Sequence, residues 1–187
     1  CDWGDHQISL IDAPGHIGFA AEVQRSLRVL DGGIVVFDGV AGVEPQSETV
    51  WRQADRYSVP RICFANKMDR TGADYWRTIQ AIARRLGAHP VAVQMPIGAE
   101  SNFRGVVDLI EQKAILYCGA EHTEPEVAGV PEELLTEVAR RREEMIERLA
   151  EADDDLAERY LAGEVLPSAE LRAALRRATL ANKAVPV

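Results

Sequence analysis

The sequence has few of the features that would assign a protein class at once. Its 187 residues include only three cysteines, Cys1, Cys63 and Cys118, with no metal-ligand or redox spacing between them. This fits a reducing cytosol better than a disulfide scaffold. The given sequence shows no signal-peptide pattern and no apolar run long enough to cross a membrane. The formal net charge of −9 has the wrong sign for a large nucleic-acid-binding surface, so we expect no membrane or DNA partner.

Two short polar motifs follow apolar segments that have the pattern of buried parallel strands. Segment 7–11 ends at the first motif and segment 61–65 at the second, with one further strand and two helices expected between them. The carboxyl ends of such strands are where open α/β sheets bind ligands. Together the motifs predict a guanine-nucleotide switch. The first motif is Asp12, Ala13, Pro14, Gly15 and His16, and the second is Asn66, Lys67, Met68 and Asp69.

The second motif has the chemistry of a guanine reader. The Asp69 carboxylate can accept two parallel hydrogen bonds from the N1–H and 2-amino groups of guanine. Adenine offers neither donor and would leave the carboxylate desolvated and unpaired. The stem of Lys67 can lie across the base plane, and the Asn66 amide can bond both the base and the loop backbone. We therefore expect guanine to be chosen over adenine.

The first motif has the chemistry of a phosphate and metal switch. A carboxylate at Asp12 suits a Mg²⁺ ion between the phosphates, because this ion takes oxygen ligands and tends to keep several waters; we expect the contact to run through water. Gly15 has no Cβ, so its N–H can approach a terminal phosphate closely and move away after that phosphate has left. GTP and Mg²⁺ are the expected cofactors.

Longer stretches of the sequence resemble the elongation factor G family of translational GTPases. The family usually has Thr where this chain has Ala13, and Asp where it has Gly18. A glycine inside a helix costs about 1 kcal/mol relative to alanine, so the helix after the first motif is expected to start later or to be looser here. Besides residues 12–16, the resemblance is carried by residues 22–32, 42–54 and 66–73 and, more loosely, by 96–100, 105–109 and 180–182.

The resemblance implies a function and a set of partners. It implies a GTPase in which His16 is catalytic and positions the attacking water, and in which loss of the terminal phosphate releases Gly15 and its helix. It further implies a ribosomal translocase that moves tRNA and mRNA. The implied contacts are ribosomal RNA at the GTPase-activating site and the ribosomal stalk protein, the latter through an inserted subdomain. We expect a monomer in the cytoplasm or an organellar matrix.

The sequence contains no Gly-x-x-x-x-Gly-Lys-Ser/Thr phosphate loop, the element whose backbone amides and lysine cradle the phosphates. Half of the predicted nucleotide site is therefore absent from the chain. The first residue, Cys1, is not an initiator methionine. We interpret the chain as an internal fragment of a GTPase domain, cut at both ends, and expect the fragment alone to be catalytically inactive.

Alternating helix and strand patterns predict an α/β fold for the first part of the chain. This is a partial P-loop GTPase domain with a mostly parallel sheet and flanking helices. We assign residues 1–87 to its core. The expected strands are 7–11, 34–37 and 61–65. One helix is expected after Gly15, with apolar residues at positions 19, 23, 27 and 30. Two more are expected at 46–57 and 75–86, and the second of these is closed by Gly87.

From about residue 88 the pattern changes to short strands followed by helices, which predicts an inserted α+β subdomain over 88–182. Residues 183–187 are expected to begin the next strand of the GTPase domain. The last helix is predicted to have Ser168 as its N-cap. The expected strands are 91–95, 103–109 and 114–118, followed by a loop at 119–130 and helices at about 131–151, 155–161 and 168–181.

Other conspicuous residues have simpler interpretations. Arg140, Arg141 and Arg142 lie among glutamates and predict a solvated helix face with mixed-sign pairs rather than an RNA-binding patch. The tryptophans Trp3, Trp51 and Trp76 are expected to pack in the interior. His6, His89 and His122 lack partners at metal-ligand spacing and receive no role.

Three alternatives to a translocase remain at this stage. The first is another translational GTPase, of the release factor 3 or ribosomal-protection type; run 43–49 favours the translocase. The second is a non-catalytic protein-binding module, which is all that the isolated fragment could be. The third is an ATPase, against which Asp69 argues because adenine offers it no donors.

Overall fold

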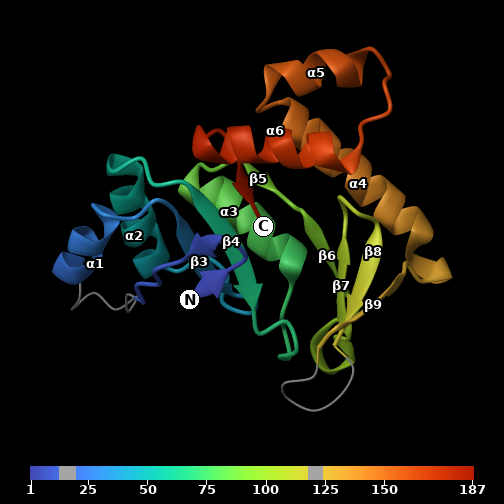
Figure 1. Ribbon diagram of the computed structural model, residues 1–187. Helices are drawn as coiled ribbons and strands as arrows, with labels where there is room; N and C mark the ends of the chain where they lie inside the picture. Colours follow the sequence, from blue (N-terminus) through green and yellow to red (C-terminus); the bar gives the residue numbers. More distant parts are fainter. Residues whose placement is uncertain (13–19, 118–123) are drawn as a thin grey trace.

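A computed structural model describes residues 1–12, 20–117 and 124–187 of the chain (Figure 1). Strands β3 (Gly33–Asp38) and β4 (Arg61–Asn66) are parallel and in full register, so Asp38 stands opposite Asn66 at their carboxyl ends. A second parallel pair, β5 (Pro90–Val91) with β10 (Val185–Pro186), lies next to β4 through β10. The predicted strands 34–37 and 61–65 and the parallel sheet are confirmed.

Two helices cover one face of this parallel sheet. Helix α2 (Pro45–Arg56) begins with a proline in its first turn, a position that suits this residue. Helix α3 (Tyr75–Leu86) ends at Gly87 in the left-handed conformation (φ 64°), as predicted. Their buried side chains pack with inward-facing strand residues, among them Phe37, Trp51, Cys63 and Ile82. The opposite face carries four exposed apolar side chains, Ile34, Val36, Ile62 and Phe64.

Helix α1 (Ala20–Leu27) packs against α2 through a small separate cluster. Its Val23 and Leu27 contact Ala54 and Val59. The helix predicted after Gly15 is therefore present from residue 20; its first expected apolar position, residue 19, lies outside the described residues, and Leu30 follows the helix end.

The second half of the chain forms an antiparallel sheet and three helices. The sheet has the order β6 (Gln94–Ile97), β7 (Gly105–Asp108), β8 (Lys113–Leu116) and β9 (Glu126–Gly129). Its buried residues share one continuous core with α4 (Leu135–Ala150), α5 (Asp154–Leu161) and α6 (Ser168–Leu180), in which α5 packs against α4 and α6. Short 3₁₀ turns, η2 (Glu100–Asn102) and η3 (Glu132–Leu134), precede β7 and α4.

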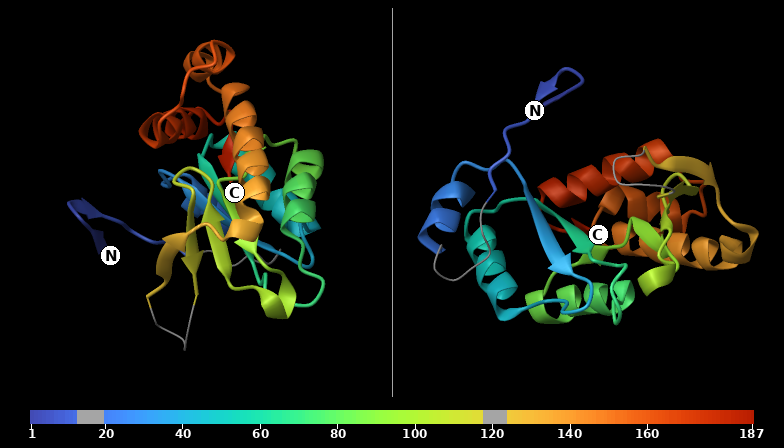
Figure 2. Two further views of the ribbon diagram at one scale, coloured as in Figure 1. Left: turned by 90° about the vertical axis from the view of Figure 1, so that its right-hand side faces the viewer. Right: turned by 90° about the horizontal axis from the view of Figure 1, so that it is seen from below.

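The predicted strand 7–11 is wrong. The chain forms instead a short antiparallel hairpin of β1 (Asp2–Trp3) and β2 (His6–Gln7), which stands clear of the body of the molecule (Figure 2). Cys1 and Ile8 exchange backbone hydrogen bonds of 2.7 Å in both directions. Among the described residues β3 has β4 as its only ladder partner. Residues 8–11 therefore lie exposed outside any ladder, and the short hairpin forms in place of the predicted strand.

Other details of the prediction also need correction. The predicted loop 119–130 contains β9, and strand 91–95 is divided between β5 and β6, which pair with different partners. Ser168 is not the N-cap of α6; the cap residue is Pro167, and the Ser168 hydroxyl donates to the carbonyl of Ile110 at 3.0 Å. The Ser168 side chain thus bonds to a carbonyl of a distant segment and not to an N–H of its own helix.

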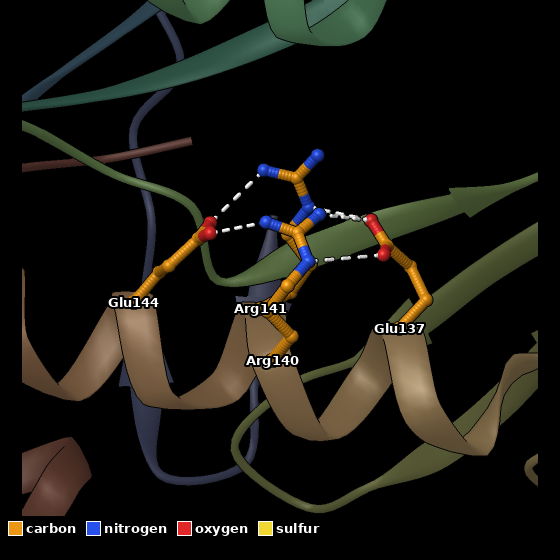
Figure 3. Close-up of polar contacts among 4 residues, drawn as sticks. All are labelled: Glu137, Arg140, Arg141 and Glu144. Atoms are coloured by element: carbon orange, nitrogen blue, oxygen red, sulfur yellow. Dashed lines mark hydrogen bonds and ion pairs between the residues drawn. The ribbon is translucent and has the colours of Figure 1, made fainter.

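The predictions for the tryptophans and the arginine run are confirmed for some residues and wrong for others. Trp51 is buried and Trp76 is partly buried, as predicted, but Trp3 is 72% exposed on the hairpin. Arg140 and Arg141 lie between Glu137 and Glu144 of α4 and pair with both (Figure 3), which confirms the mixed-sign helix face.

Two members of the arginine run also make contacts outside that face. The Arg141 guanidinium lies 3.4 Å from the ring centroid of Trp76 on α3, a cation–π contact. Arg142 is partly buried and donates to the carbonyls of Leu109 and Ile110, so for this residue the prediction of a solvated side chain is wrong.

Across the described ranges, no helix combines the length and the apolar composition needed to span a membrane. The assignment of residues 1–87, 88–182 and 183–187 to separate parts stays a prediction. The pairing of β5 with β10 is relevant to this division, because it joins residues 90–91 of the predicted subdomain to residues 185–186 of the predicted next strand in one parallel ladder.

Candidate functional site

The candidate site lies at the carboxyl ends of β3 and β4. Here Asp38 and Asn66 end their strands side by side, and the Gly39 N–H donates to the Asn66 carbonyl at 2.8 Å. The chain then turns through residues 67–73 before α3 begins. This is the edge at which ligands bind open α/β sheets, and residues 66–69 are the predicted guanine reader.

The loop after Asn66 is shaped by its own polar groups. The Asn66 Oδ1 accepts from the Lys67 N–H at 2.8 Å, and Lys67 adopts a left-handed backbone conformation (φ 60°), which is uncommon for a residue other than glycine. Two turns follow, in which Arg70 N–H donates to Lys67 O and Ala73 N–H donates to Arg70 O, each at 3.1 Å. The loop is therefore a fixed structure and not an extended linker.

An ion pair holds the Lys67 side chain across the strand ends. Its Nζ lies 2.5 Å from Asp38 Oδ2, while Asp38 Oδ1 accepts from the N–H groups of Val40 and Ala41 at 2.8 and 3.1 Å. The hydrogen bond from Lys67 is the main cause that lowers the pKa of Asp38 from 3.8 to about 2, and the two backbone hydrogen bonds add to it. The stem of Lys67 is thus fixed beside the loop that carries Asp69.

The Asp38 carboxylate is expected to titrate near pH 2 in the folded protein. Because the folded-state pKa lies below the ordinary value of 3.8, the pair stabilises the fold above that value, and this stabilisation is lost as the pH falls through about 2. NMR titration of the Asp38 carboxyl carbon measures the midpoint directly. In a Lys67→Met variant the midpoint should rise toward the ordinary value; a midpoint that does not respond would contradict the assigned cause.

Met68 is the buried residue of the second motif. Its side chain is 8% exposed and belongs to the core under α2 and α3. Gly39 lies directly against it: a Cβ at this position would stand 2.8 Å from Met68 Sδ and 3.0 Å from the Asn66 carbonyl oxygen. The next residue, Asp69, is exposed.

Asp69 is exposed and, within residues 1–12, 20–117 and 124–187, makes no hydrogen bond or ion pair. It lines a cleft of about 230 Å³ together with the other three residues of the motif. The remaining walls come from β4, from the first residue of α3, from the antiparallel sheet with the residues that flank its strands, and from Val187. They include the aromatic residues Phe64, Tyr75, Phe103 and Tyr117. An unpaired carboxylate at the mouth of a partly aromatic cleft is suited to a planar base that carries two adjacent N–H donors.

The first motif is not brought to this cleft by the described residues. Asp12 is exposed at the end of the unpaired segment 8–11, and Ala13, Pro14, Gly15 and His16 lie outside the described residues. In the described parts of the chain no group of three or more His, Cys, Asp or Glu side chains could hold a metal ion. A single accessible carboxylate nevertheless fits Mg²⁺, which is held by one or two carboxylates together with waters and substrate phosphates.

Two residues of the site were missed by the sequence analysis. Asp38 ends its strand one position after the predicted segment 34–37, so the strand-end rule that identified Asn66 could have found it. Glu100 bonds to the loop after Asp69 from a distant turn, and no local signal in the sequence indicates this contact.

Comparison with known proteins identifies the family. The model of the elongation factor Tu GTP binding domain matches residues 1–179. Elongation factor G of Thermotoga maritima is 54% identical, and that of Fervidobacterium nodosum 56% identical, over the whole chain. The chain spans 27% of the length of each of these relatives.

A solved structure shows the same fold. A crystal structure of a protein from Thermus thermophilus has a TM-score of 0.82 and 31% identity, covering 94% of this chain and 26% of that one. The prediction of a partial α/β GTPase domain is thereby confirmed. With a family model matching residues 1–179 and relatives more than half identical over its whole length, the chain belongs to the elongation factor Tu GTP-binding domain family, and it is similar to segments of elongation factor G.

Proposed function

We propose that this chain is the guanine-reading part of a GTP-binding domain and that the protein containing it is a GTPase. The observation that carries the proposal is the state of the second motif. Asn66 and Lys67 are held by bonds within the site, Met68 is buried, and Asp69 is left unpaired at the cleft. A carboxylate kept free in an otherwise fixed loop is preorganised for a ligand.

Each residue of the motif has a separate role in this proposal. Asp69 accepts from the N1–H and 2-amino groups of guanine. The Lys67 stem, fixed by the ion pair to Asp38, supports the base plane. The Asn66 side-chain oxygen already accepts from the Lys67 N–H, so its amide hydrogens remain available for the base or the neighbouring backbone.

The phosphate half of the site is proposed from the first motif. Asp12 holds Mg²⁺ through water, and this ion supplies charge neutralisation at the phosphates. Ala13, Pro14 and Gly15 form the phosphate switch, and His16 orients the attacking water. Loss of the terminal phosphate then frees the Gly15 N–H, which lets the following segment move.

The relatives suggest the biological setting. They are elongation factor G proteins that match the chain over its whole length at 52–56% identity, which favours this class over release factor 3 or ribosomal-protection proteins. We propose that the protein acts on the ribosome, where it moves tRNA and mRNA. It would contact ribosomal RNA near His16 and the stalk protein through residues 88–182, as a monomer in the cytoplasm or an organellar matrix.

Nucleotide selectivity of the full-length protein tests the proposal. We expect GTP and GDP to displace a fluorescent GDP analogue, and ATP and ADP to fail at concentrations about a thousandfold higher, because a site built around two specific hydrogen bonds rejects ligands that lack the donors. Equal displacement by adenine nucleotides would remove the guanine-reading role of Asp69 and with it the proposed function.

A further inference from the structure

Glu100 contacts the guanine-reading loop from a distant turn of the chain. Its side-chain Oε1 accepts from the Gly72 N–H at 2.7 Å, and its backbone N–H donates to the Met68 carbonyl at 3.1 Å. These two bonds reach the residue before Asp69 and the third residue after it. The short segment that carries the free carboxylate is therefore held at both ends by one residue.

The turn that presents Glu100 is built for a fixed geometry. Glu100 has a left-handed backbone conformation (φ 53°), which a residue with a Cβ adopts only when its surroundings require it. Gly98 precedes it with φ 80°, and a Cβ there would stand 2.0 Å from the Asn102 carbonyl oxygen. Behind the turn, Phe103 N–H donates to Glu100 O and Arg104 N–H donates to Ile97 O, so the turn is tied to the ends of β6 and β7.

The turn bond from the Arg70 N–H to the Lys67 carbonyl spans Asp69 within the loop, and Glu100 adds two contacts to this segment from a distant part of the chain. The Asn66 carbonyl is bound to Gly39 and the Lys67 side chain to Asp38, but both contacts lie before Met68. After Asp69, the carbonyl of Gly72 accepts from Arg77 Nη2 at 2.8 Å, whereas the Gly72 N–H is bound by Glu100 alone among the described residues. The two contacts of Glu100 thus enclose Asp69 directly.

We propose that Glu100 is a positioning residue for guanine recognition. It does not touch the base; it fixes the backbone on both sides of Asp69, so that the carboxylate meets the N1–H and 2-amino donors without first ordering the loop. The antiparallel sheet thereby contributes to the specificity of a site that lies at the ends of the parallel strands. This inference rests on the proposed guanine-nucleotide function.

The test compares GDP with inosine diphosphate, which lacks the 2-amino group, on the full-length protein. The ratio of the two affinities reports how well Asp69 is placed for its second hydrogen bond. Truncation in Glu100→Ala is expected to lower this ratio by roughly fivefold to tenfold, because one partner of Asp69 is then poorly aligned. Glu100→Gln keeps a side-chain oxygen that can accept from Gly72 and should restore most of the preference.

Three further measurements make the result decisive. Glu100→Gly accepts the left-handed conformation without strain and serves if the alanine variant does not fold. Amide hydrogen exchange at Gly72 should become faster in both truncations. Glu126→Ala, which removes an exposed carboxylate on β9, should change neither readout.

The outcomes separate the two proposals. A parent protein with no preference for GDP over inosine diphosphate and adenosine diphosphate would overturn the proposed function. A parent that prefers GDP, together with truncations that keep the parent's affinity ratio, would overturn the role of Glu100 and leave the proposed function standing. An equal loss of affinity for GDP and inosine diphosphate would also leave the ratio unchanged and would overturn it in the same way.

Discussion

Replacing Asp69 with asparagine in the full-length protein is expected to weaken GTP binding by about a hundredfold or more. The amide presents a donor where guanine also has donors, and one of the two charge-assisted hydrogen bonds to the base is replaced by a repulsive contact. Xanthosine triphosphate has an oxygen in place of the 2-amino group and matches the new donor, so its affinity should rise by a comparable factor.

Competition between GTP and xanthosine triphosphate for a fluorescent nucleotide measures both effects in one experiment. Asp31→Asn is a matched control, since Asp31 is exposed after α1 and is far along the chain from the loop at 66–73. It should bind both nucleotides as the parent does. If Asp69→Asn also leaves both affinities unchanged, Asp69 is not the base reader, whatever else the loop contributes.

The local structure around the loop proposed to read the base could be predicted from the sequence because its signals are local. An apolar run of strand length ends at Asn66, and the helix after the loop has the pattern of one apolar face closed by Gly87. The structure reproduces both elements, with β4 over Arg61–Asn66 and α3 over Tyr75–Leu86. Propensity, turn chemistry and burial agree here, and such agreement makes a segment predictable.

The strand before Asp12 could not be predicted correctly from the same kind of pattern. The apolar alternation of residues 7–11 is typical of a strand, but a strand also needs neighbours that satisfy its backbone groups. No ladder to β3 forms in the described structure, and the hairpin of β1 and β2 takes the first residues instead. A sequence pattern indicates which side chains a segment could bury. Whether the segment pairs in a sheet depends on which strands lie beside it.

The long-range contacts of the site could not be predicted from local sequence patterns either. The ion pair of Asp38 with Lys67 joins residues that are 29 positions apart, and the bond of Glu100 to Gly72 spans 28. Ser168 illustrates the reverse case, because its hydroxyl bonds to Ile110 across 58 positions and does not cap its own helix. Long-range partners decide what a polar side chain does, and the sequence gives only its capacity to donate or accept.

We expect hydrolysis to depend on His16 of the first motif, and the expected effect of removing it is equally large. In the full-length protein bound to ribosomes, His16→Ala should lower kcat for GTP by about a hundredfold or more, since an in-line water without an orienting side chain reacts slowly. KM should stay nearly constant, because the proposed guanine contacts lie in the separate loop at Asn66–Asp69.

Multiple-turnover phosphate release measures kcat and KM for His16→Ala against a matched histidine control. His6→Ala serves as that control, since His6 lies in the exposed hairpin, where its ring stands 6.2 Å from that of Trp3. A parent-like kcat in the His16 variant would exclude a role in hydrolysis. A raised KM at constant kcat would instead place His16 among the nucleotide-binding contacts, because uniform binding and transition-state contacts separate in this way.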